Sequence, residues 1–175
     1  MSELRTNRIV PRDGLPSGSS GGIVQIKSAT KTDRQESSSS TYADVSGMSV
    51  SITPTRSDSK IYIAINVHVG GISPAYIGFR VLRDSTIVTQ GTHATGNRTN
   101  VTFGSRIDAD YDNYMNSFNF LDSPSTTSAT TYKLQFAAIY DPSNRKVVVN
   151  GTGDDANADY TLCGTSTITV MEVSG

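Results

Sequence analysis

The 175-residue sequence contains no tryptophan and only one cysteine, Cys163. A single cysteine cannot form a disulfide within the chain, so the fold is expected not to depend on oxidation. Cys163 is interpreted as a small residue near a strand, with a reactive thiol as the alternative. Long apolar runs are missing too: residues 2–20 lack the apolar core of a signal peptide, and no stretch approaches the roughly 20 apolar residues of a membrane helix.

An excess of charge of one sign is also missing. The 15 lysines and arginines nearly balance the 16 aspartates and glutamates, which leaves a formal net charge of -1. A nucleic-acid binder needs a strongly basic surface, whereas the basic residues here are dispersed, apart from three arginines near the N-terminus. The sequence therefore predicts no nucleic-acid partner and no membrane insertion.

Residues of the kinds used in catalysis are few. There are two histidines, His68 and His93, and the chain has no nucleophile elbow, no zinc-ligand spacing and no phosphate-binding loop. We therefore expect no catalytic residues and no cofactor. The less favoured alternative is a polysaccharide-degrading enzyme that would use Asp110, Asp112 and His68.

One acidic stretch, residues 108–113, begins like a calcium-binding loop. Asn113 stands where such loops carry glycine, and Asn119 stands where they carry a bidentate glutamate. The flanking residues are not helical in pattern either. We therefore expect no metal ligands in this chain.

Serine and threonine are abundant, at roughly a quarter of all residues, which exceeds ordinary usage and favours polar strand faces. The clearest strand covers residues 60–69, where isoleucine and valine occupy every second position. Further stretches with strand character are 23–28, 48–52, 76–82, 85–90, 100–103, 117–121, 131–140, 146–149 and 165–173.

This pattern of nine or ten short strands, with no amphipathic stretch long enough for a helix, predicts an all-β fold. The expected architecture is an antiparallel β-sandwich of the jelly-roll type over residues 22–175. Two hairpins are expected. One turns at Arg83 and Asp84, and the other spans residues 131–149, where residues 141–144 have turn composition.

Residues 1–21 show neither strand nor helix periodicity and end in a Ser/Gly run of linker composition. Such a segment cannot bury enough apolar area to offset its ordering entropy. We therefore expect an extended N-terminal arm that is ordered by a partner protein. Its candidate anchoring residues are apolar or basic: Leu4, Arg5, Arg8, Ile9, Val10 and Arg12.

A cluster of aromatic residues and one methionine lies within residues 111–120. One interpretation is core plus a sheet edge. The other is a subunit interface, since tyrosine and methionine are enriched at interfaces. The candidate interface residues are Tyr111, Tyr114, Met115, Phe118 and Phe120.

Four segments together suggest a family. They are "ELRTNRIVPRDGLPSGSSGGIVQIKSATKTD", "YADVSGMSVSITPTRSDSKIYIAINVHVG", "FNFLDSPSTTSATTYKLQF" and "STITVMEVSG", with "NRIVPRDG" and "TITVMEV" as the most specific parts. The sequence resembles small tail-fibre-like or appendage virion structural proteins of marine, cyanobacteria-infecting tailed bacteriophages. The resemblance covers nearly the whole chain.

The resemblance implies a non-enzymatic virion structural protein, assembled in the host cytoplasm. It would act as a tail fibre, neck appendage or capsid decoration, and its arm would hold a capsid, portal, neck or tail protein. The strand pattern is also similar to the trimeric jelly rolls of the C1q and tumour-necrosis-factor type, which implies a homotrimer. The alternative is a receptor-binding tip that recognises a host surface glycan or protein through residues 91–100, 108–116 and 151–160.

Overall fold

A computed structural model describes residues 22–174. These residues form eleven strands and no helix, as the alternation of apolar and polar residues predicts. It follows that the described chain has no helix able to cross a membrane. The strands are β1 (Ile23–Lys31), β2 (Gln35–Ser37), β3 (Ala43–Ile52), β4 (Lys60–Gly71), β5 (Ala75–Arg83), β6 (Thr86–Ile87), β7 (Phe103–Ile107), β8 (Tyr114–Asp122), β9 (Thr130–Ala138), β10 (Val147–Val149) and β11 (Ser166–Val173).

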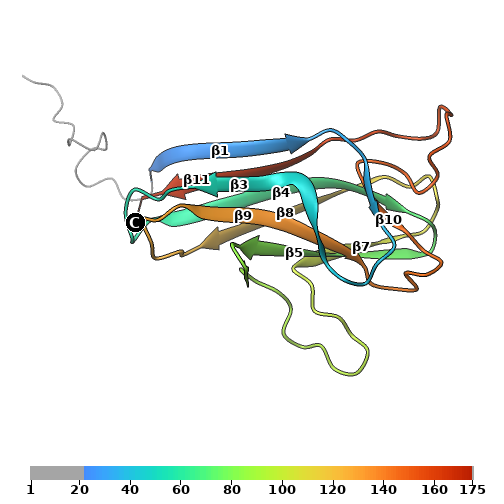
Figure 1. Cartoon of the computed structure of the whole chain (residues 1–175), viewed down its shortest axis with the longest axis horizontal. Helices are drawn as coiled ribbons and strands as arrows, with labels where there is room; N and C mark the ends of the chain where they lie inside the picture. Colours follow the sequence, from blue (N-terminus) through green and yellow to red (C-terminus); the bar gives the residue numbers. More distant parts are fainter. Residues whose placement is uncertain (1–21, 175) are drawn as a thin grey trace, which may run out of the picture.

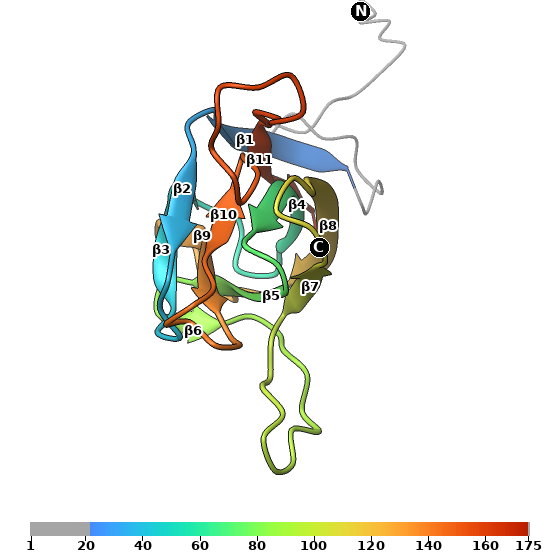
Figure 2. The same ribbon diagram turned by 90° about the vertical axis from the view of Figure 1, so that its right-hand side faces the viewer.

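The strands form two antiparallel sheets packed face to face (Figures 1 and 2). The first sheet has the order β1-β11-β4-β8, and the short strands β10 and β2 extend it at one end. The second sheet has the order β3-β9-β5-β7, with β6 on the end of β5. Eight principal strands that exchange between two sheets in this order form a jelly roll. The predicted fold class is confirmed.

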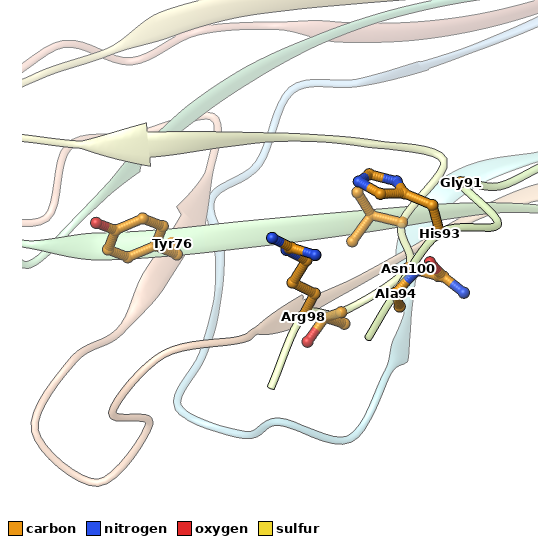
Figure 3. Close-up of a pocket in the computed structure, with 8 residues that line it drawn as sticks. Tyr76, Gly91, His93, Ala94, Arg98 and Asn100 are labelled. Carbon is orange, nitrogen blue, oxygen red and sulfur yellow. Dashed lines mark hydrogen bonds between the residues drawn. The ribbon is translucent and has the colours of Figure 1, made fainter. Parts of the chain in front are cut away.

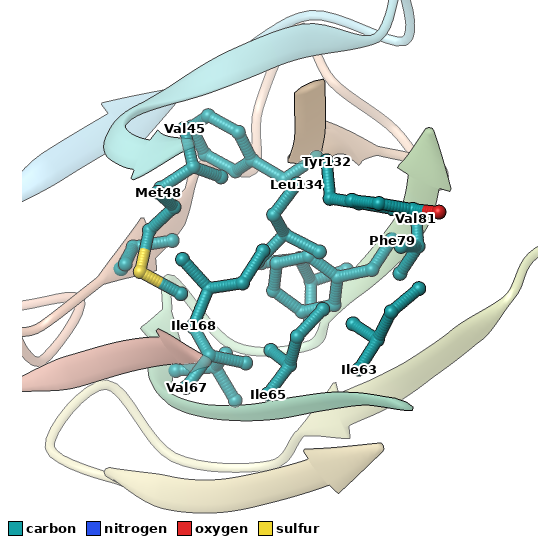
Figure 4. Packing of buried hydrophobic residues seen from close by; sticks show 14 of the residues in the cluster. Val45, Met48, Ile63, Ile65, Val67, Phe79, Val81, Tyr132, Leu134 and Ile168 are labelled. Carbon is teal, nitrogen blue, oxygen red and sulfur yellow. The ribbon is translucent and has the colours of Figure 1, made fainter. Parts of the chain in front are cut away.

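The core fills the space between the two sheets (Figure 4). On β4 the alternate residues Ile61, Ile63, Ile65, Val67 and Val69 are buried, while the residues between them face outward. The second sheet meets this row with aliphatic and aromatic side chains such as Phe79, Leu134 and Phe136. Period-2 alternation therefore sets which face of each strand lies in the core.

One predicted hairpin is confirmed and the other is wrong. Strands β5 and β6 pair across Asp84 and Ser85, one residue later than the predicted turn at Arg83 and Asp84, because Arg83 itself pairs with Thr86. Residues 131–149 do not form a hairpin, because β9 lies in the second sheet and β10 in the first. Both edges of β9 are already paired, with β3 and β5, so β10 has no free edge there and adds to β4 instead.

The two ends of the described chain lie together at one end of the sandwich. The backbone N–H of Ser174 donates to the carbonyl of Gly22, at 3.0 Å between nitrogen and oxygen. The described chain therefore begins beside the end of β11. The predicted anchoring residues, Leu4, Arg5, Arg8, Ile9, Val10 and Arg12, lie outside the described residues.

A buried carboxylate, Glu172 on β11, lies at this same end. Its oxygens accept hydrogen bonds from the Gln25 side chain, the Thr55 backbone N–H and the Thr55 hydroxyl, each at 2.7 Å. Burial raises the pKa of the Glu172 carboxyl, but these hydrogen bonds outweigh burial and leave its pKa below the usual value. Through these hydrogen bonds, Glu172 connects β11 to β1 and to the loop after β3.

This lowered pKa predicts an acid-sensitive contribution to stability. A carboxyl whose pKa is lower in the folded state stabilises above its unfolded pKa of about 4.3, and the stabilisation is lost as the pH falls through the folded pKa. We expect the free energy of unfolding to fall less steeply below about pH 4.3 in Glu172→Gln than in the wild type. Urea unfolding of both proteins at several acidic pH values measures this, and equal slopes would contradict it.

Candidate binding groove

A hollow in the described chain lies on the outer side of the second sheet, under the loop of residues 88–102. This loop joins β6 to β7 and projects away from the sandwich (Figures 1 and 2). Two adjoining hollows, of about 560 and about 350 Å³, share Tyr76 and Val101 in their linings. We call them together the groove. Its larger part is lined by His93, Arg98 and Asn100 from the loop and by Tyr76 from β5 (Figure 3).

The base of the loop is fixed to β5. Thr102 donates its backbone N–H to the Phe79 carbonyl at 2.8 Å, and its hydroxyl donates to the Thr89 carbonyl at 2.6 Å. Gly78 allows this close approach, because a Cβ there would lie 2.8 Å from the Tyr42 hydroxyl and 2.9 Å from Val101 Cγ1. The glycine therefore lets side chains of two loops close over the middle of β5.

The outer part of the loop carries its own hydrogen bonds. Arg98 Nη1 donates to the Thr95 hydroxyl at 2.8 Å, and the Ala94 backbone N–H donates to Asn100 Oδ1 at 3.2 Å. Arg98 extends its guanidinium group into the space between Tyr76 and His93 (Figure 3). Because His93 and Arg98 are exposed, their polar atoms are accessible from solvent.

On the sheet, Tyr76 and Arg106 line the groove, and further aromatic rings and a second arginine lie near them. The Tyr76 ring packs edge-on against Tyr140, with 5.3 Å between centroids, and the Arg106 guanidinium lies 5.8 Å from the Tyr76 centroid. Arg80 stacks over the Tyr42 ring at 3.8 Å. These are the ring and guanidinium surfaces on which planar or sugar-like ligands pack.

Two polar atoms near the groove are buried without a hydrogen-bond partner, the Tyr42 hydroxyl and Arg80 Nε. Burial raises the pKa of Tyr42 above its usual value. The lining of the groove contains Arg98, Arg106 and His93 and no carboxylate, although Arg106 pairs with Asp108 at 2.8 Å. The groove therefore favours an anionic or neutral polar ligand over a cationic one.

A smaller hollow, of about 310 Å³, brings His68, Asn113 and Cys163 together. His68 Nδ1 lies 2.8 Å from Asn113 Oδ1, while Cys163 is exposed. Within residues 22–174 no hydrogen bond joins the thiol to either histidine, and none joins a histidine to a carboxylate. The nucleophile–base contact that thiol catalysis needs is thus not formed by these residues.

The carboxylates of Asp110 and Asp112 accept hydrogen bonds from nearby groups of the protein. Asp110 accepts the Ser73 backbone N–H at 2.7 Å, and Asp112 accepts the Ala109 backbone N–H at 2.8 Å and the Tyr114 hydroxyl at 2.7 Å. In the described part of the chain, no three histidine, cysteine or acidic side chains gather as metal ligands would.

The three loops that the sequence suggested for receptor binding do not form one surface. Residues 108–116 and 151–160 do meet, because the Asp154 N–H donates to the Asp110 carbonyl at 2.9 Å and Tyr111 packs on Tyr160. Residues 91–100 lie apart from them, in the projecting loop (Figure 2). The sequence analysis did not identify Tyr76 and Arg106, which complete the groove from β5 and β7. The one sequence signal at this place is the pair of glycines Gly78 and Gly104, which lie opposite each other on β5 and β7 and leave room for other groups to approach the strands.

The candidate interface residues divide between two surfaces. Tyr111, Tyr114 and Met115 are exposed, by 58%, 42% and 51%. Phe118 and Phe120 face the other way and pack against the core, with Phe118 stacked on Phe103 at 5.4 Å between centroids. Alternation along β8 separates Met115 from Phe118 and Phe120, since neighbouring residues of a strand point to opposite faces. Tyr114 has the same phase as the two phenylalanines but is exposed at the start of the strand, and Tyr111 lies before it.

Comparison with known proteins finds similarity among solved structures only. No protein-family model matches the chain, and no curated protein matches it. Among solved structures, a chain of infectious bursal disease virus, Gx strain, is similar with a TM-score of 0.48 and 13% sequence identity. The match covers 98% of this chain and 42% of that chain, so this protein spans less than half the length of the viral chain.

Proposed function

We propose that this chain is a non-enzymatic structural protein of a bacteriophage particle, held by residues 1–21 and displaying its jelly roll. The observation that carries the proposal is the strand order β1-β11-β4-β8 over β3-β9-β5-β7, an architecture used by viral capsid and lectin domains. Fold alone does not define function. The local hydrogen bonds of Asp110, Asp112 and His68 support a structural role over a catalytic one.

The arm supplies the means of attachment in this proposal. The described chain begins at Gly22, beside the end of β11, so the junction with the 21 preceding residues lies at one end of the sandwich. Apolar Leu4, Ile9 and Val10 would dock on another particle protein, and the three arginines would pair with its carboxylates. The resemblance to virion proteins of cyanobacteria-infecting phages supports this assignment.

Incorporation of variant chains into particles tests the proposal. Full-length chains carrying Leu4→Ser, Ile9→Ser and Val10→Ser are expected to be absent from purified particles, while the matched set Ser17→Ala, Ser19→Ala and Ser20→Ala in the linker is incorporated normally. Both sets leave residues 22–174 unchanged. Normal incorporation of the apolar-to-serine chain would contradict attachment through the arm.

The groove supports a second function, recognition of an acidic saccharide on a host surface. The Tyr76 ring gives a stacking surface, Asn100 and His93 give polar contacts, and Arg98 gives a positive charge. The lining of the groove contains no carboxylate that would repel an acidic sugar. This function is compatible with the structural one, because the groove lies on the outer side of the second sheet, whereas the described chain begins at Gly22 beside the end of β11 in the first sheet.

We expect Tyr76→Ala and Arg98→Ala each to weaken binding of acidic oligosaccharides by about tenfold, which corresponds to about 1.4 kcal/mol. A glycan array with acidic and neutral oligosaccharides identifies the ligand, and titration measures the loss. Arg56→Ala is the matched control, since Arg56 is an exposed arginine remote from the groove. Binding that survives both groove substitutions would exclude this site.

A further inference from the structure

The outer face of the first sheet carries an uninterrupted apolar row across all four principal strands. Ile26 of β1 lies opposite Met171 of β11, Met171 lies opposite Tyr62 of β4, and Tyr62 lies opposite Leu121 of β8. We call these four residues the apolar row. Ile26 is 54% exposed and Leu121 is 52% exposed, so both ends of the row are open to solvent.

No charged residue lies in the apolar row or in the next two rows along the strands. Those rows contain only serine, threonine, asparagine and alanine and end on β8 at Asn119 and Ser117. We call the three rows the neutral face; Lys60 lies just beyond it, in the row of Val173. By contrast, the outer face of the second sheet carries Arg80, Arg106 and Lys133.

Two pairs of polar side chains on the neutral face are hydrogen-bonded to each other. The hydroxyls of Ser28 and Thr169 lie 3.0 Å apart, and the Ser117 hydroxyl donates to Asn66 Oδ1 at 2.7 Å. Because these four groups keep these hydrogen bonds when water leaves, covering them costs less desolvation than covering unpaired groups. Scarcity of charge is the compositional mark of an interface core, and apolar residues exposed side by side mark a docking surface.

We propose that the neutral face packs against the same face of a second copy of this chain. A face without charges offers no complement to a charged partner, whereas a second copy presents an equally neutral sheet. Identical faces that pair are related by a two-fold axis, so the product is a dimer. The inference rests on the proposed function and deepens it by naming a partner.

A two-fold axis parallel to the strands superimposes the two neutral faces fully. It places Ile26 opposite Leu121 of the second copy, and Met171 opposite Tyr62 of the second copy. Sheets packed this way lie about 10 Å apart. The same axis brings both Gly22 residues, where the two described chains begin, to one end of the dimer. The homotrimer implied by the resemblance is the competing arrangement.

The test is the oligomeric state of the full-length chain by sedimentation equilibrium over a wide concentration range. The wild type is expected to be dimeric, and Ile26→Lys and Leu121→Lys are each expected to be monomeric. Tyr140→Lys is the matched control, because Tyr140 is 53% exposed but not on this face, and it is expected to remain dimeric. Circular dichroism and thermal unfolding establish that every variant is folded.

A charge-pair variant tests the orientation. In the proposed dimer the double substitution Ile26→Lys with Leu121→Asp creates two lysine–aspartate contacts across the axis, so it is expected to restore dimers that Ile26→Lys alone has lost. A monomeric wild type, a trimer, or an oligomer that persists in the lysine variants would overturn the inference. The proposed function is tested separately, by the incorporation of the arm variants into particles, so a failure of the dimer and a failure of the proposed function can be told apart.

Discussion

We expect Asp122→Ala to lower the free energy of unfolding by about 3 kcal/mol, because it breaks a buried cluster that joins the two sheets. Asp122 ends β8 in the first sheet and is 8% exposed. Its carboxylate accepts the Tyr132 hydroxyl of β9 at 2.7 Å and Arg83 Nη1 of β5 at 2.8 Å. Burial, together with the neighbouring carboxylate, raises the pKa of Tyr132 well above its usual value.

Removing the carboxylate leaves the buried Tyr132 hydroxyl without a partner and Arg83 without its counter-charge. Arg83 is partly exposed, so water compensates part of its loss, which keeps the expected change below that of a fully buried pair. Tyr132→Phe removes only one donor, and we expect it to cost about 1–2 kcal/mol. Urea unfolding measures both; a loss under about 1 kcal/mol for Asp122→Ala would contradict the role given to the cluster.

The second large effect is expected at Asn150, which connects four segments where β10 ends. Its side-chain Nδ2 donates to the carbonyls of Lys31 at 2.9 Å and Asp33 at 3.2 Å, and its Oδ1 accepts the Ser166 hydroxyl. Its backbone N–H donates to the His68 carbonyl at 3.0 Å. The residue is 1% exposed and has a φ of 62°, a left-handed conformation that asparagine tolerates.

We expect Asn150→Ala to lower the free energy of unfolding by about 3–4 kcal/mol. The substitution leaves buried polar groups unpaired, and it puts alanine, which lacks the local hydrogen bonds of asparagine, in a left-handed conformation. Asn150→Gly loses the same hydrogen bonds but suits the backbone, so it is expected to be more stable than Asn150→Ala by about 1 kcal/mol. Asn97→Ala, on the exposed loop, is the control with little expected change. If glycine were no better than alanine, backbone conformation would not contribute.

Strand character could be predicted from the sequence wherever burial on one side imposes alternation. Residues 60–69 are the clearest case, and they form β4, the strand at the centre of the first sheet. Pairing could not be predicted in the same way, because partner choice depends on which sheet edges are still free. The 131–149 segment shows this: its turn composition was correct for a local turn, while both edges of β9 were already paired.

The candidate surfaces were predictable only in part for a related reason. The cluster at residues 111–120 was recognised as a group, but alternation on β8 sends Phe118 and Phe120 into the sandwich and leaves Met115 outside. The apolar row draws one residue from each of four strands that are distant in sequence, so only the sheet register reveals it. The groove likewise combines a loop with side chains of β5 and β7.

The central proposal is that this chain is a displayed structural subunit of a virus particle. Its most direct test is quantitative mass spectrometry of gradient-purified particles of the proposed phage. The account predicts that the chain co-purifies with intact particles in a fixed ratio to the major capsid protein, and that it remains after washing. A chain found free in the lysate and absent from the particles would contradict the account.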